Sequence, residues 1–295
     1  MTVGAECVTM KDLETGSMLR RVIPSALVAL AAAGALTAAS LSAQWLKYPT
    51  PNVPRTPDGK INMAAPTPRT PDGKPDFSGL WFTDDTPPCP RSLSDFIECG
   101  VELPISRYGL NIAAGVKGGL PVQPWAAAIV RKRTAEQSKD DPHARCMPDM
   151  FLRLYGLPHY MKILQLPNLL VELSEANAVY RQVFTDDRPL PDDPSPNWQG
   201  YSSAKWDGDT LVVSSIGFRD DQWLDMAGNF ISEQAKIRER IRRPDYGHLI
   251  IDATVDDPKV YTKPWDITFK QRIIVGTELV DEYCIENEKS SQRFK

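Results

Sequence analysis

The chain has 295 residues, a formal net charge of −4 and 24% charged residues. This composition is typical of a globular protein with one large or two small hydrophobic cores. The chain lacks the excess of Lys and Arg that nucleic-acid binding requires, and its acidic balance disfavours anionic polymers. We therefore expect no nucleic-acid partner.

The N-terminal 43 residues are predicted to be an upstream segment followed by a cleaved signal peptide. A basic segment at 19–21 precedes an Ala-rich apolar run at 22–41, and small residues at 40, 42 and 43 suit cleavage between Ala43 and Gln44. Met18 directly precedes the basic segment, which leaves Met1 and Met18 as alternative starts. A membrane anchor is the competing interpretation, because the apolar run is long enough to span a bilayer. We expect a periplasmic or secreted protein with no membrane span after cleavage.

Export would make the cysteines candidates for disulfides. Cys7 lies upstream of the predicted signal, and four cysteines follow it, which allows three pairings. We favour Cys89–Cys99, which closes a short loop, and Cys146–Cys284, which would connect the middle of the chain to its last predicted strand. A closure of that length contributes about 4 kcal/mol in the chain-entropy treatment of disulfides. The sequence has no Cys-x-x-Cys and no His at ligand spacing from these cysteines, so we predict no metal site.

Residues 44–75 form a Pro-rich segment that contains the hexapeptide Arg-Thr-Pro-Asp-Gly-Lys twice, at 55–60 and 69–74. Each Pro-Asp-Gly is a turn signal. The segment is predicted to be an extended linker with two turns, and the alternative is an arm that docks on the rest of the protein or on a partner. Residues 76–295 are predicted to be one β-rich domain that carries a helix–loop insertion near 87–142.

The insertion contains the best helical pattern, at 124–138, with a proline in the first position. The remaining elements are predicted to be strands, because β-branched and aromatic residues alternate between turn signals. A first strand begins within 76–81, and Asp207-Gly208 suits the two-residue turn of a central hairpin. The expected strands after residue 157 are 161–166, 169–173, 179–185, 201–206, 210–216, 234–242, 249–255, 265–274 and 277–286. This order predicts an antiparallel meander that forms a barrel or strongly curved sheet, with a lipocalin-like barrel as the nearest analogy.

Six motifs stand in order along the mature chain. They are PDGKPDFSGLW at 71–81, QPWAA at 123–127, DPxxRCMP at 141–148, WDGDTLVV at 206–213, WLD at 223–225 and DPxxYTxPW at 257–265. As a set they resemble a group of exported bacterial proteins, and the resemblance covers most of the mature chain without implying an activity. It implies that Cys146 and Cys284 belong to the common pattern. Relatives often carry a His-containing segment where this chain has residues 228–232, so a catalytic role for that His would not apply here.

The candidates for acid–base catalysis are two carboxylates and two histidines: Asp221, Asp225, His159 and His248. The carboxylates flank Trp223 and would serve as an acid/base pair, as ligands of a hard cation, or as solvated loop charges. Each His stands next to a predicted strand and would act as a general base at neutral pH or as a hydrogen-bonded structural residue.

The candidates for ligand contact are Tyr201, Trp223, Arg240 and Trp265. Aromatic side chains at the mouth of a barrel suit planar or sugar-like ligands. In the 236–242 segment the basic residues share one face of the predicted strand. An inward Arg with Glu239 nearby would form a polar anchor, and an outward charged face is the alternative.

The function favoured by the sequence is binding of a small, partly apolar molecule by an exported β-barrel, with the ligand opening near 218–225. The first alternative is an acid–base enzyme of the isomerase, lyase or hydratase type on the same barrel, with Tyr201 or Arg240 orienting the substrate. Acyl transfer is disfavoured because the sequence has no Gly-x-Ser-x-Gly. The second alternative is a protein–protein interaction module of the cell envelope that uses the Pro-rich segment. No cofactor is expected.

Overall fold

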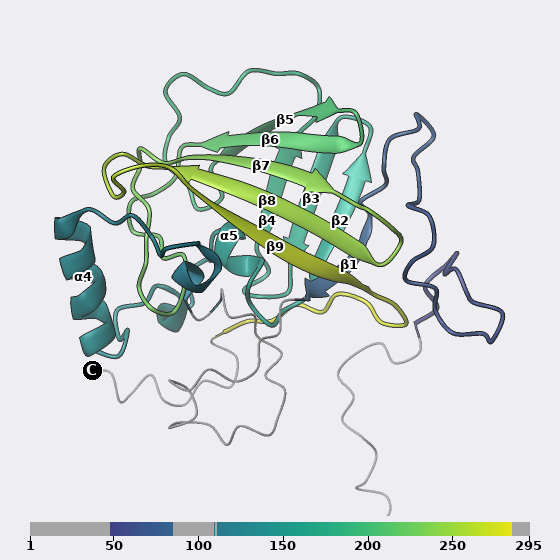
Figure 1. Ribbon diagram of the computed structural model, residues 1–295, viewed down its shortest axis with the longest axis horizontal. Coiled ribbons are helices and arrows are strands. Elements are labelled where there is room, and N and C mark those ends of the chain that lie inside the picture. The colour runs from purple at the N-terminus through teal and green to yellow at the C-terminus, as the bar shows by residue number, and fades with distance from the viewer. Residues whose placement is uncertain (1–47, 85–108, 110, 285–295) are drawn as a thin grey trace, which may run out of the picture. The chain divides into compact units, whose positions relative to one another are not determined.

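The computed structural model describes residues 48–84, 109 and 111–284. Nine strands close into a barrel in chain order, with β1 pairing both β2 and β9 (Figure 1). The predicted β-barrel class is therefore confirmed. The strands are β1 (Gly79–Thr83), β2 (Met161–Leu166), β3 (Leu169–Ser174), β4 (Tyr180–Phe184), β5 (Tyr201–Asp207), β6 (Thr210–Ile216), β7 (Lys236–Arg242), β8 (His248–Asp256) and β9 (Trp265–Ile274).

Side chains alternate between the barrel interior and the outside, as the period of two in a strand requires. In β8 and β9 every second residue is buried along nearly the whole strand. The predicted hairpin is confirmed, because β5 and β6 pair from Tyr201↔Ile216 to Asp207↔Thr210 around Gly208. The two turn residues are Gly208 and Asp209, one position later than the predicted Asp207-Gly208, and Gly208 has a φ of +59°. Glycine at the first turn position and the alternating flanks determine the register of this hairpin.

The expectation of an antiparallel meander is wrong at one step. Strands β4 and β5 run parallel and share two residue pairs, Val183↔Ser202 and Phe184↔Ser203. A parallel pair requires the chain to return along the barrel before the second strand begins, and the long 185–200 connection provides that return (Figure 1). The barrel therefore contains both antiparallel and parallel strand pairs. The parallel β4–β5 junction, called the seam below, is joined by two residue pairs.

The expectation of a last strand at 277–286 is also wrong for the described residues up to 284. This segment forms one isolated bridge, between Ala176 and Glu282. The physical reason is that β9 already pairs with β8 and β1, so the closed barrel offers no free edge there.

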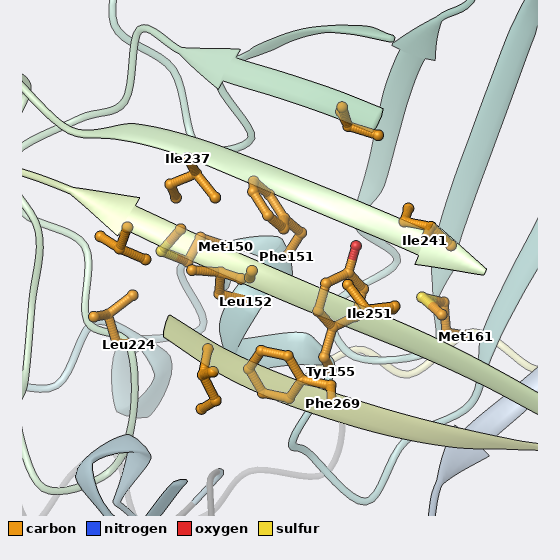
Figure 2. Close-up of a cluster of buried hydrophobic side chains, with 14 of the residues drawn as sticks. Met150, Phe151, Leu152, Tyr155, Met161, Leu224, Ile237, Ile241, Ile251 and Phe269 are labelled. Carbon is orange, nitrogen blue, oxygen red and sulfur yellow. The ribbon is translucent and has the colours of Figure 1, made fainter. Parts of the chain in front are cut away.

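The interior of the barrel is filled by a short helix, α5 (Phe151–Leu154), and the residues around it (Figure 2). Phe151 and Tyr155 are almost completely buried, and the Tyr155 ring lies 5.4 Å from that of Phe269 on β9. The Gln271 side chain donates a hydrogen bond to the Tyr155 carbonyl (2.8 Å). The interior is thus packed with side chains, so any sizeable ligand site must lie elsewhere.

The longest helix of the described residues is α4 (Pro124–Ala135). It begins as predicted and ends three residues earlier than 138, because Gln137 and Ser138 have left-handed φ values of 55° and 54°. The predicted Cys146–Cys284 disulfide is present. The Cys89–Cys99 prediction lies outside the described residues. Among the residues that the structure describes, no helix is long and apolar enough to cross a membrane.

Gly200 lies directly before β5 and has a φ of +63°, which an L side chain rarely adopts. A Cβ there would lie 2.6 Å from the Ile216 carbonyl oxygen and 2.7 Å from the Phe218 ring. We expect Gly200→Ala to lower the free energy of unfolding by about 2 kcal/mol. Gly208→Ala is the matched control, because Gly208 has a similar φ of +59° with nothing within 4 Å, and we expect it to cost about 1 kcal/mol. Urea denaturation of both variants measures the difference, and equal losses would contradict the clash.

Candidate functional site

A large cleft opens at the parallel seam. β4 and β5 share only two residue pairs, and residues on their N-terminal side, together with the 185–200 connection, line a cleft of about 1070 Å³. Aromatic and proline side chains line much of it, including Tyr180, Phe184, Trp198 and Tyr201. Arg181 and Ser202 also line the cleft, and both are buried.

A buried polar cluster connects the base of this cleft to the barrel interior. Its members come from five successive strands and from the residue after α5: Tyr155, Glu172, Arg181, Ser202, Ser215 and Glu239. Glu172 and Arg181 are direct partners in the β3–β4 ladder, and Ser202 and Ser215 are partners in the β5–β6 ladder. Register therefore brings these side chains together on the inner face of the sheet.

Arg181 is the centre of the cluster. Its guanidinium pairs with Glu239, contacts Glu172 at 3.3 Å, and donates to Ser215 Oγ at 3.0 Å. The guanidinium also lies 3.5 Å from the centre of the Phe151 ring. The positive charge of Arg181 stabilises the two buried carboxylates, because the barrel interior would otherwise disfavour their negative charge.

The Tyr155 hydroxyl lies between the two carboxylates of the cluster. The hydroxyl lies 3.1 Å from Glu172 Oε1 and 2.9 Å from Glu239 Oε1, and it accepts a hydrogen bond from Arg181 at 3.0 Å. Burial, reinforced by the Glu239 charge, raises the pKa of Glu172, although Arg181 opposes this effect. Burial also raises the pKa of Tyr155 well above its usual value. The hydroxyl has one proton, which it can donate to Glu172 or to Glu239 while its oxygen accepts from Arg181.

The connection that covers the cleft is anchored at Gln199. Its side-chain amide donates a hydrogen bond to the Asp149 carbonyl (2.6 Å), while its Oε1 is buried without a hydrogen-bond partner. Asp149 also pairs with His143 (2.6 Å) and with the buried Arg153 (3.2 Å). The hydrogen bond to Asp149 holds the His143 ring and raises the pKa of His143.

The two carboxylate candidates lie in different environments. Asp221 forms an ion pair with Arg219 (2.5 Å) at the surface, and this hydrogen bond lowers the pKa of Asp221. Asp225 is fully buried and accepts hydrogen bonds from the Ile112 amide (2.7 Å) and the Asn229 side chain (2.6 Å). Burial raises the pKa of Asp225 to about 6 despite these bonds. Asp225 thus links the segment that contains Ile112 to the loop that contains Asn229.

The two histidine candidates each pair with a different carboxylate. His159 Nε2 lies 2.8 Å from Glu282, and His248 Nδ1 lies 2.7 Å from Asp245. No hydrogen bond or ion pair joins any two of the four acid–base candidates within the part of the chain that the structure describes. Their catalytic roles stay predictions.

Two of the four ligand candidates line concave surfaces. Tyr201 lines the seam cleft and is 37% exposed. Trp223 lines a smaller groove of about 440 Å³ beside α4, where the Arg133 guanidinium lies 4.4 Å from the centre of its ring. The predicted opening near 218–225 corresponds to this groove, whereas the larger cleft is at the β4–β5 seam.

The other two ligand candidates lie elsewhere. Arg240 points outward and pairs with Asp207 (3.0 Å), so the outward charged face of β7 is confirmed and the inward Arg is wrong. Glu239, its neighbour, is the residue that points inward. Trp265 is buried, and its ring lies 5.4 Å from that of Tyr261.

Sequence reasoning missed Glu172, Arg181 and Tyr155. Two of them left a signal, because Glu172 interrupts the apolar run 169–173 and Arg181 occupies a position that alternation assigns to the inside of β4. A charged residue at an inward position of a strand requires a partner of opposite charge. The two signals together could have predicted the pair.

The described residues contain no group of His, Cys, Asp and Glu side chains arranged to hold a metal ion. No family model and no curated protein matches the chain. The case for function therefore depends on the geometry of the site.

Proposed function

We propose that this protein binds a small, partly apolar molecule in the cleft between β4 and β5. The observation that carries the proposal is the cleft itself, whose volume of about 1070 Å³ is at the upper end of the usual range for small-molecule sites. The weak β4–β5 pairing supports it, because a two-pair seam leaves room that the other, longer ladders of the barrel do not.

The lining suggests the chemistry of the ligand. Tyr180 is 63% exposed and Tyr201 37% exposed, so aromatic faces are available to a planar group. Arg181 and Arg188 each have an ion-pair partner, and the Asp192 carboxylate also lines the cleft. A planar, partly apolar molecule would match this surface.

We favour binding over acid–base catalysis for this site. A general acid or base must reach the substrate within hydrogen-bond distance. Glu172 and Glu239 are at most 5% exposed, and Arg181 and Tyr155 already occupy their oxygens. The cluster therefore supports the floor of the cleft without presenting a carboxylate to it.

We further propose that the protein acts in the cell envelope or outside the cell. The sequence pattern of residues 19–43 supports export. The Cys146–Cys284 bond adds support, because disulfides persist mainly in oxidising compartments.

Native mass spectrometry of protein isolated gently from its own source tests the binding proposal. We expect wild-type protein to carry one small molecule, and Gln182→Trp, which fills the exposed rim of the cleft, to carry none. Lys270→Trp on β9 is the matched control at an exposed position away from the cleft, and it should retain the molecule. Retention by Gln182→Trp would contradict the assignment of the cleft.

A further inference from the structure

The two copies of Arg-Thr-Pro-Asp-Gly-Lys, at 55–60 and 69–74, have the same conformation. In both copies the Thr amide donates to the Lys carbonyl (2.9 Å in each), and the Gly amide donates to the Thr carbonyl (2.8 and 2.9 Å). The Arg side chain donates to the Gly carbonyl (2.7 and 2.8 Å), and the Thr hydroxyl donates to the Asp carboxylate. The hexapeptide is therefore a preformed unit that presents its Arg in a fixed orientation.

The second copy shows what this unit binds. Arg69 forms a two-pronged ion pair with Asp209 in the turn of the β5–β6 hairpin (2.9 and 2.6 Å). Lys74 Nζ lies 3.5 Å from the Gly208 carbonyl oxygen and 5.6 Å from the centre of the Trp206 ring. The unit thus contacts the acidic side chain, the backbone and the flanking aromatic residue of one β-turn.

The first copy binds no corresponding β-turn among the described residues. Arg55 is exposed, and its side chain makes one hydrogen bond, to the Gly59 carbonyl, without an ion pair to any described carboxylate. Lys60 is 82% exposed and pairs with Asp58 of its own turn. The same arrangement of donors that holds Asp209 in the second copy is therefore presented to the outside.

We propose that residues 55–60 bind an exposed, Asp-bearing β-turn of a partner protein, in the way that residues 69–74 bind Asp209. The exposed Asp58 in the turn disfavours a polyanion, because its charge lies beside the cations. A second copy of this chain is a poor occupant, since its own Arg69 already holds Asp209. A turn is favoured over an extended acidic segment because the second copy contacts Trp206, Gly208 and Asp209, which only the folded hairpin holds in this arrangement.

The test uses the full chain and a cyclic peptide that copies residues 204–212, closed by a disulfide between two added cysteines. In an NMR titration of isotope-labelled protein, we expect the peptide to shift the signals of residues 55–60 with a Kd of about 1 mM, as suits one exposed ion pair with a few added contacts. A peptide with Asp209→Asn should bind about fivefold more weakly, because it loses the two-pronged pair.

Two protein variants provide the matched comparison. Arg55→Ala should weaken binding of the peptide by about fivefold, whereas Arg69→Ala, which changes the same position of the other copy, should leave the shifts at 55–60 in place. Absence of binding up to about 10 mM, equal affinity for the Asp and Asn peptides, or an Arg55→Ala variant with wild-type affinity would each overturn the proposal.

Discussion

Replacing Arg181 with Met is expected to lower the free energy of unfolding by about 4 kcal/mol. Arg181 is 2% exposed and is the cation that pairs with both Glu172 and Glu239 inside the barrel. Methionine fills a similar volume but leaves these two carboxylates buried without a positive charge. Urea denaturation followed by circular dichroism measures the loss, and a cost below about 1 kcal/mol would contradict the role of Arg181.

Two controls separate charge from packing in this prediction. Arg188→Met makes the same substitution in the lining of the cleft, where Arg188 pairs with Asp186 at the surface, and it should have little effect. A triple variant that adds Glu172→Gln and Glu239→Gln to Arg181→Met removes the uncompensated charges. It should recover at least half of the lost stability, because neutral groups are less costly to bury than unpaired ions.

The two glutamates of the cluster are expected to respond differently to the same substitution. Glu239 is fully buried and forms the closest pair with Arg181, so Glu239→Gln should cost about 3 kcal/mol. Burial already raises the pKa of Glu172 and favours its neutral form, which an amide resembles. Glu172→Gln should therefore change the free energy of unfolding by less than about 1 kcal/mol at pH 7. Equal costs would show that the two carboxylates share the charge.

The dependence on pH follows from the same pKa shift. A carboxyl group with a raised pKa binds its proton more tightly in the folded state than in the unfolded state. Its contribution to stability is fully present below the unfolded value of 4.5 and is lost as the pH rises through the folded value. Relative to wild type, Glu172→Gln should therefore gain stability between pH 5 and pH 8. Denaturation curves at both pH values, compared with those of Gln182→Met, provide the measurement.

The barrel could be predicted from the sequence because the alternation of buried and exposed residues is a local property of each strand. The glycine of the β5–β6 turn, Gly208, and the regular pattern of β8 and β9 carry that information. The parallel β4–β5 pair could not be predicted in the same way. The sequence of residues 185–200 shows a long connection, but it does not show in which direction the next strand runs. The extra strand predicted at 277–286 fails for a related reason: closure of the barrel is a property of the whole sheet.

The candidate site was much less predictable than the fold. Tyr201 is the one sequence candidate that lines the seam cleft. It lies there because it is the first residue of β5, a strand that the sequence predicts. The cluster around Arg181 depends on register across five strands and on α5, which carries Tyr155 into the interior. Apart from the Glu172–Arg181 pair on adjacent strands, these contacts join residues far apart in the chain, and no spacing in the sequence encodes them.

The most direct measurement of the central claim is a crystal structure of the protein isolated gently from its own source. The account predicts electron density for one non-protein molecule in the β4–β5 cleft, in contact with Tyr180 and Tyr201. A retained molecule that lies in the groove beside Trp223, or an empty cleft in protein whose native mass shows a bound molecule, would contradict it.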